Sequence, residues 1–398
     1  MSKISADTVE AKTTNGDLVL QGNGTGVPDL ASGTKLNGTA LTDTFSTQSP
    51  VGANLIINGD MRIAQRGTVA GISNAAAYGG PDRVGIVNSN LGVVTVQQTT
   101  DAPANTAFVS CHEVDVTTAD ASPAAADQLA TYYSFEGLDL QHLKWGTANA
   151  EDLTLQMYVK SNKTGNFVLE CYMPDGGGYH TSQLVNIAVA DTWELKTITI
   201  PGNTSQAPAN DNTVGLSFYF WLDSGTDYTG GSLNAGWAAF SAANRAAGIT
   251  LALGDNTTNY FRMTGLKAEV GSTATAFVPD DYGTAYRKCA RYFWSTSGQG
   301  TKDNDALVSH CNVFNSSTAY CSVYHPVPMR AMPTLTVDAA SNFRTSDTAN
   351  HTLSALTDNS SSPRMAQLEA VASGMSGGQA TRLQHIGANG VLEFDAEL

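Results

Sequence analysis

The sequence predicts an all-β protein, and its composition and patterning together indicate this class. Hydrophobic residues make up 41% of the 398 residues and charged residues only 14%, with 38 glycines to form tight turns. Several segments alternate apolar and polar residues with a period of two. Because alternating segments and Gly-rich turns are typical of antiparallel sheets, we expect strands rather than helices. A chain of this length exceeds one usual hydrophobic core, so we expect two or three domains.

Residues 1–50 are predicted to form an N-terminal attachment and trimerisation segment. Their short extended pieces are separated by Asn-Gly and Gly turns. A strand-rich segment this thin buries little by itself, so partner chains are expected to cover it, as in an intertwined trimeric shaft or an anchor on a larger assembly. We therefore expect a homotrimer that docks through this segment.

Residues 51–280 are predicted to form an antiparallel jelly-roll sandwich. Alternating strands recur between turn sequences such as PDGGG, PGN and DSGTD. The expected core-facing residues are Leu153, Leu155, Met157 and Val159 in one strand, and Leu216, Phe218, Phe220 and Leu222 in another. Residues 234–248 have helical propensity and end at Gly248, which predicts a short surface helix or a lid-like insertion.

Residues 281–398 are predicted to form a second, smaller C-terminal β domain. Its strands include the stretch CNVFNSSTAYCSVYHPVPM and the ending GVLEFDAEL. The five cysteines are irregularly spaced and are expected to be reduced core residues: Cys111, Cys171, Cys289, Cys311 and Cys321. Although Cys311 and Cys321 lie near His310 and His325, the sequence lacks paired C-x-x-C spacing, so we expect no metal site there.

Charge and hydropathy exclude two classes of partner. The formal net charge is −15, and no Lys/Arg cluster is present to follow a phosphate backbone, so no nucleic-acid binding is expected. No apolar run approaches the roughly 20 residues that span a bilayer, so no membrane insertion is expected. The opening MSKISADTVEAKTT lacks an apolar signal-peptide core, and the protein is expected to be made as a cytoplasmic product.

The sequence gives no sign of catalytic chemistry. It contains no G-x-S-x-G, P-loop or H-E-x-x-H motif. Acidic residues are numerous, and a glycosidase pair needs no fixed spacing, but nothing marks which two acids would serve. We therefore expect a protein that is not an enzyme and needs no cofactor.

The second face of the sandwich is the candidate binding surface. Its residues are Gln156, Tyr158, Glu170, Tyr172, Tyr219 and Trp221. A second candidate surface is the GGGYHT loop (176–181), whose Tyr179 and His180 are expected at an end of the sandwich, where binding loops cluster. Aromatic rings stack on the C–H faces of sugars, and amides and carboxylates bond to sugar hydroxyls, so this composition favours glycan recognition. The alternative is that a trimer neighbour or the 234–248 insertion buries the same face.

Several motifs in order resemble a jelly-roll module that recurs in tailed-bacteriophage fibre and other virion proteins and is related to carbohydrate-binding modules. The motifs are NLIINGDMRIAQRGT (54–68), PDRVGI (81–86), DTWELKTITIPG (191–202), LKAEVGSTATAFVPDDYGTAYRKCARYF (266–293), VYHPVPMRAMPTLTV (323–337) and VLEFDAEL at the end. The chain departs from the family where Tyr158 and Val84 stand in place of frequent tryptophans. These departures weaken the transfer of individual ligand contacts.

The resemblance implies a non-catalytic structural protein of a tailed-phage virion, a tail fibre or spike that contacts host surface glycans. It would be made in the host cytoplasm and dock on other virion proteins through residues 1–50. Two alternatives stay open: a capsid-decorating head fibre or spike, and a polysaccharide depolymerase tailspike. A structural calcium ion near Asp60 or Glu269 is a lesser implication of the same resemblance.

Overall fold

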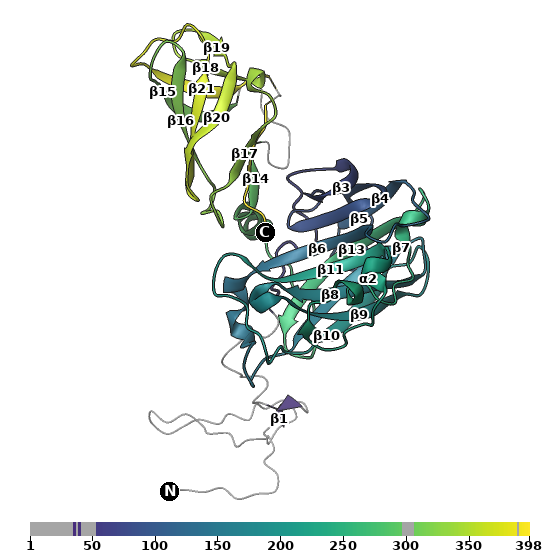
Figure 1. Ribbon diagram of the computed structural model, residues 1–398. Coiled ribbons are helices and arrows are strands. Elements are labelled where there is room, and N and C mark those ends of the chain that lie inside the picture. The colour runs from purple at the N-terminus through teal and green to yellow at the C-terminus, as the bar shows by residue number, and fades with distance from the viewer. Residues whose placement is uncertain (1–34, 37–38, 41–52, 297–305, 388–389) are drawn as a thin grey trace, which may run out of the picture. The chain divides into compact units, whose positions relative to one another are not determined.

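The computed structural model describes residues 35–36, 39–40, 53–296, 306–387 and 390–398, as drawn in Figure 1. Contacts divide the chain into two units, Met1–Ser49 and Pro50–Leu398. In the first unit, β1 (Lys35–Leu36) pairs antiparallel with β2 (Thr39–Ala40). The rest of the predicted attachment segment lies outside the described residues, so its docking role stays a prediction.

The all-β fold class is confirmed by a jelly-roll-like sandwich made from one curled sheet of eleven strands in the second unit. The order of its strands is β10-β7-β13-β5-β4-β6-β11-β8-β9-β12, with β3 beside β4. Their bounds are β3 (Val69–Tyr78), β4 (Val84–Thr99), β5 (Cys111–Thr118), β6 (Gln128–Glu136), β7 (Leu153–Ser161), β8 (Gly165–Met173), β9 (Tyr179–Ile187), β10 (Glu194–Ile200), β11 (Val214–Ser224), β12 (Ala238–Ala239) and β13 (Tyr260–Val270). Short helical turns connect them: η1 (Gly137–Leu143), η2 (Asp175–Gly177), α2 (Thr226–Thr229), η3 (Ala242–Asn244) and η4 (Leu253–Asp255).

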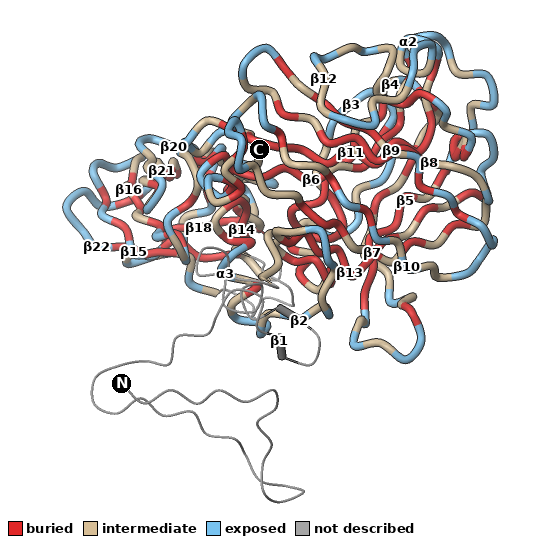
Figure 2. The backbone as a smooth tube through the Cα atoms, turned by 90° about the horizontal axis from the view of Figure 1, so that it is seen from below, coloured by how far each residue is buried: buried red, intermediate tan, exposed pale blue. Residues whose placement is uncertain are grey.

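Strand β4 joins the two layers of the sandwich. Its first part, from Val84 to Asn90, pairs with β6, and its later part, from Val93 to Thr99, pairs with β5. One layer therefore contains β10, β7, β13 and β5, and the other contains β6, β11, β8 and β9. The predicted alternation is confirmed, because the inward residues of β7 and β11 are fully buried in one core that also appears as the red interior in Figure 2.

The predicted helix at 234–248 is wrong. The segment contains the two-residue strand β12 and the turn η3, and no α-helix. Backbone pairing overrides the local propensity, since Ala238 and Ala239 pair with β9 and the Ser182 amide donates to the Asn234 carbonyl at 2.7 Å. Trp237 fixes the segment further by donating from its indole nitrogen to the Pro201 carbonyl at 2.7 Å.

The C-terminal part of the chain has its own hydrophobic core and two smaller sheets. Helix α3 (Tyr282–Ala290) is capped by the preceding Asp281, whose side chain accepts from the Thr284 amide. A three-stranded sheet contains β14 (Phe293–Ser295), β23 (Leu392–Asp395) and β17 (Thr334–Val337). A seven-stranded sheet contains β15 (Leu307–Val313), β16 (Thr318–Tyr324), β18 (Phe343–Ser346), β19 (Asn350–Thr352), β20 (Ala355–Ser361), β21 (Met365–Val371) and β22 (Ala380–His385), with the turn η5 (Ala340–Asn342) before β18.

The prediction that all five cysteines are reduced is wrong for one pair. Cys311 and Cys321 form a disulfide, because β15 and β16 place them directly opposite each other with their Cα atoms 4.1 Å apart. The other three cysteines are free and buried, as expected. Within the described part of the chain, no helix is long and apolar enough to cross a membrane.

Candidate functional site

A groove of about 320 Å³ lies on the outer face of the β6–β11–β8 layer. Its aromatic residues are Tyr132 on β6, Tyr219 on β11 and Tyr172 on β8, all half-buried. The remaining lining residues are Ala76, Val87, Gln128, Ser134, Pro174, Val214, Ser217, Arg245 and Leu398. This lining combines aromatic rings with hydroxyl, amide and guanidinium groups.

Strand register explains why the tyrosines form a row. Tyr219 lies directly opposite Tyr132 in the β11–β6 ladder, and their ring centroids are 5.6 Å apart. Tyr78 on β3 extends the row, with its ring centroid 5.5 Å from that of Tyr132. The Tyr132 ring lies across Gly85 of β4, where an added Cβ would come within 2.3 Å of the ring. Because Gly85 has no side chain, the row lies close against the sheet.

The phenols of Tyr132 and Tyr219 keep their protons over the physiological range. Burial raises the pKa of Tyr132 to about 12. Burial also raises the pKa of Tyr219, although the nearby Arg245 guanidinium opposes the shift. Neutral phenols can both donate and accept hydrogen bonds. On the same floor, the hydroxyl oxygens of Ser134 and Ser217 lie 2.8 Å apart in a hydrogen bond.

The buried carboxylate of Glu170 holds Arg245, the positively charged residue of the groove. Glu170 on β8 is fully buried, and both its oxygens accept from the Arg245 Nε, at 3.0 and 2.9 Å. The Glu170 Oε2 also accepts from the Trp221 indole at 2.9 Å, and Oε1 lies 3.0 Å from His180 Nδ1. The Arg245 guanidinium carbon lies 5.0 Å from the Tyr219 ring centroid. Arg245 is therefore fixed at the edge of the aromatic row.

Residues 225–249, which we term the covering segment, bury the continuation of the same face. Its Tyr228 ring lies 5.1 Å from the Trp221 ring, and its Ala246 belongs to the small buried cluster around Trp221. The Asn234 amide nitrogen lies 2.7 Å from His180 Nε2. This confirms one alternative from the sequence, namely that the insertion covers part of the second face.

The predicted ligand residues fall into four places. Tyr172 and Tyr219 line the groove. Trp221 and His180 are fully buried beneath the covering segment and hold Glu170, so neither offers a surface to a ligand. Tyr179 is half-buried and packs against the main core.

Tyr158 lies on the other layer. It lines a hollow of about 400 Å³ on the outer side of β7 and β13, together with Phe108 and Phe277. Its ring centroid is 5.7 Å from that of Phe108. Because β7 and β8 belong to opposite layers, alternation alone could not separate Tyr158 from Tyr172.

Sequence reasoning missed Tyr132 and Arg245. Tyr132 precedes the core-facing Tyr133 in β6, and the alternation of TYYSF contained this signal. Arg245 had no sequence signal, because only the fold of the covering segment brings it to Glu170, 75 residues away in the chain.

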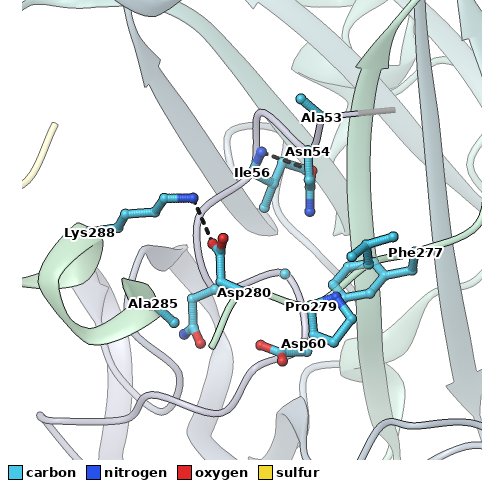
Figure 3. Close-up of a pocket in the computed structure, with 12 residues that line it drawn as sticks. Ala53, Asn54, Ile56, Asp60, Phe277, Pro279, Asp280, Ala285 and Lys288 are labelled. Carbon is cyan, nitrogen blue, oxygen red and sulfur yellow. Dashed lines mark hydrogen bonds and ion pairs between the residues drawn. The ribbon is translucent and has the colours of Figure 1, made fainter. Parts of the chain in front are cut away.

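A further pocket of about 420 Å³, shown in Figure 3, contains Asp60, one of the two residues considered for calcium. Asp60 forms an ion pair with Arg62, and the neighbouring Asp280 pairs with Lys288 at 2.6 Å. Glu269, the other candidate, pairs with Lys267 at 3.0 Å and accepts from the Thr275 amide. Both carboxylates are thus engaged by cations, and no group of three His, Cys, Asp or Glu residues among the described positions is arranged to hold a metal.

The sequence matches no protein-family profile and no curated protein. Solved structures show similarity to a phage tailspike domain and to carbohydrate-binding modules. The enzymatically active domain of tailspike protein 4 of bacteriophage CBA120 is 10% identical, with a TM-score of 0.29 over 55% of this chain and 21% of that chain. The CBM22-1 and GH10 modules of Clostridium thermocellum endo-1,4-beta-D-xylanase 10B are 11% identical, with a TM-score of 0.27 over 57% and 30%. The family 11 carbohydrate-binding module of the C. thermocellum cellulase Lic26A-Cel5E is 10% identical, with a TM-score of 0.26 over 56% and 97%. This chain therefore spans less than a third of the first two proteins.

Proposed function

We propose that the protein is a non-catalytic structural component of a tailed-phage virion that binds host surface glycans in the groove of Tyr132, Tyr172 and Tyr219. The observation that carries the proposal is the open row of half-buried phenol rings, flanked by Ser134, Ser217 and other polar groups. Flat rings contact the C–H faces of pyranose units, and the surrounding donors and acceptors bond to their hydroxyls.

The charges of the groove also support binding without catalysis. Hydrolysis of a glycosidic bond normally requires two carboxyl groups flanking that bond. None of the described residues that line the groove is Asp or Glu, and the carboxylate of Glu170, which holds Arg245, is buried and bonded to Arg245, Trp221 and His180. The groove thus has the contacts for holding a sugar without a pair of acids to cleave it.

The proposed assembly is a homotrimer that docks on the particle through residues 1–50. A shallow groove of this kind binds one sugar segment weakly. Three copies on one spike, and several spikes on one particle, would raise the effective affinity by multivalency without any new contact.

The site is tested by affinity electrophoresis through gels that contain purified bacterial capsular polysaccharides or O-polysaccharides. We expect at least one polysaccharide to retard the wild-type chain and Tyr219→Ala to weaken the binding about tenfold, equivalent to roughly 1.4 kcal/mol. Tyr158→Ala is the matched control, because it removes a half-buried tyrosine from the opposite layer. Absence of retardation by every polysaccharide would overturn the glycan function, and loss of retardation only in Tyr158→Ala would move the site to the other hollow.

The location is tested by cryo-electron microscopy of the intact particle. Density for this chain at the tail is the expected result and fits a receptor-contacting fibre or spike. Density on the capsid shell would instead make it a head decoration. In a separate assay, release of oligosaccharides when the purified chain is incubated with a host polysaccharide would make it a depolymerase.

A further inference from the structure

The last residues of the described chain are held against the jelly roll by a buried ionic network. We term residues 395–398 the closing segment. Glu397 is nearly buried and forms ion pairs with Arg83, which is 1% exposed, and with Arg66 at 3.2 Å. The Arg66 Nη2 also pairs with Asp395 at 2.9 Å. Arg330 donates to the carbonyls of Ala396 and Glu397, each at 2.8 Å.

This network gathers motifs that lie far apart in the sequence. Arg66 comes from the stretch 54–68, Arg83 from PDRVGI, Arg330 from the stretch 323–337, and Glu397 from the ending VLEFDAEL. Tyr292 adds its ring, whose centroid lies 3.5 Å from the Arg83 guanidinium carbon. The motifs therefore meet at one junction between the jelly roll and the C-terminal part of the chain.

The same network reaches the groove at two points. Arg83 donates from Nη2 to the carbonyl of Ser134, a residue of the groove lining, at 2.6 Å. The Tyr78 hydroxyl donates to the Leu398 carbonyl at 2.8 Å, and Leu398 itself lines the groove. In Figures 1 and 2 the C-terminus lies beside β6, the strand that carries Tyr132.

We propose that the closing segment is part of the glycan site: Leu398 contacts the ligand, and Arg83 and Glu397 are positioning residues that hold Leu398 in place. The inference rests on the proposed function of the groove. It makes the site composite, so that ligand binding requires the C-terminal segment as well as the tyrosines of the jelly roll.

The physical reason is that the Arg83 side chain links the closing segment to the wall of the groove. Arg83 bonds simultaneously to Glu397 and to the Ser134 carbonyl, so a shift of the closing segment alters the groove wall. Loss of the Glu397 charge would leave the buried Arg83 without its principal counter-charge. The closing segment would then be held less firmly, and Leu398 would lose its fixed place.

The direct test is a thiol probe in the full chain. Leu398→Cys introduces a thiol that lines the groove. The five native cysteines are either buried or disulfide-bonded, so they do not compete for a thiol reagent. The probe polysaccharide is the one that most retards the wild-type chain in affinity gels. At a saturating concentration, this polysaccharide is expected to slow the labelling of the Leu398→Cys variant by an aromatic disulfide reagent about fivefold. Val189→Cys, at a position that is 54% exposed and outside the groove, is the control and should label at an unchanged rate.

The positioning role is tested by Glu397→Gln, with Leu398→Ala as a second variant that leaves the ion pairs intact. We expect each to weaken binding of the same polysaccharide about fivefold, with thermal unfolding recorded in parallel. Unslowed labelling at 398 together with unchanged affinity in Leu398→Ala would overturn the inference. If Tyr219→Ala still lost binding, the proposed function would stand. If no polysaccharide bound, both would fall together.

Discussion

The outer face of the β6–β11–β8 layer has two halves: the groove is open to solvent, and the other half is covered by residues 225–249. The same strands build both halves. On β11, Tyr219 and Trp221 are two residues apart and point to the same side. Tyr219 is half-buried and lines the groove, whereas Trp221 is 0% exposed. The difference comes from the covering segment, residues 225–249, which packs on Trp221 and places Arg245 at the edge of the groove. Alternation assigns the face of a side chain, and a distant segment decides whether solvent reaches it.

The comparison separates two roles for similar residues. Aromatic side chains in the covered half stabilise the fold, and those in the open half are available for a ligand. Substitutions in the covered half should therefore lower the free energy of unfolding, and substitutions in the open half should mainly lower affinity.

The largest effect is expected for Trp221→Ala. Removing a fully buried indole leaves a cavity and leaves Glu170 without one of its donors, so the free energy of unfolding should fall by about 3–5 kcal/mol. Chemical denaturation of the full chain measures the change. Tyr219→Ala is the matched variant in the open half, where a loss below about 1 kcal/mol is expected. Equal losses in the two variants would remove the distinction between the halves.

The next effect concerns the charge of Glu170. Glu170→Gln keeps the shape of the side chain but removes the counter-charge of Arg245, and the free energy of unfolding should fall by about 2–3 kcal/mol. Because Arg245 also lines the groove, the affinity for polysaccharide should fall in the same variant. Thermal unfolding and affinity electrophoresis give the two readouts. Unchanged stability and unchanged affinity in Glu170→Gln would show that the charge of Glu170 does not position Arg245.

A smaller effect, at the end of β11 beyond Trp221, depends on pH. Burial raises the pKa of Asp223 on β11 to about 6. Between about pH 4 and 6 the folded chain keeps a proton that the unfolded chain has lost, so the free energy of unfolding declines as the pH rises through this window. The decline should be on the order of 2 kcal/mol. Asp223→Asn removes this contribution and keeps an acceptor for the Gly254 amide, which bonds to Asp223 at 2.9 Å.

Urea denaturation of the wild-type chain and Asp223→Asn at pH 4 and pH 7 measures the difference. The wild-type chain should lose stability relative to the variant on going to pH 7. Parallel behaviour of the two proteins would show that Asp223 does not titrate in this range.

The fold was largely predictable because alternation is a local property of a strand. The inward residues of β7 and β11 followed from spacing, and the all-β class followed from spacing together with composition. The helix at 234–248 failed because backbone pairing with β9 is a long-range interaction that local propensity does not contain. The Cys311–Cys321 disulfide was missed because cross-strand register, which places the two residues opposite each other, was not read from the sequence.

The site was predictable only in part, for a related reason. Tyr172 and Tyr219 were identified from the face they share, and Trp221 shared that face too. The position of Tyr158 on the opposite layer depends on the strand order of the sandwich, which spacing does not reveal. Arg245 and Leu398 reach the groove through long-range contacts, with no pattern in their own neighbourhoods.

The smallest effect is expected when only a hydroxyl is removed from the open half. Tyr132→Phe keeps the ring that lies across Gly85, so stacking on a sugar should persist and affinity should change about threefold at most. Burial raises the pKa of Tyr132 to about 12, so the phenol is neutral in any ordinary binding assay and its loss removes one hydrogen-bonding group rather than a charge. Tyr132→Ala, which also removes the ring, should weaken binding several times more. Equal loss in the two variants would mean that the hydroxyl, and not the ring, makes the contact, and the open half would then be a polar site rather than a stacking platform.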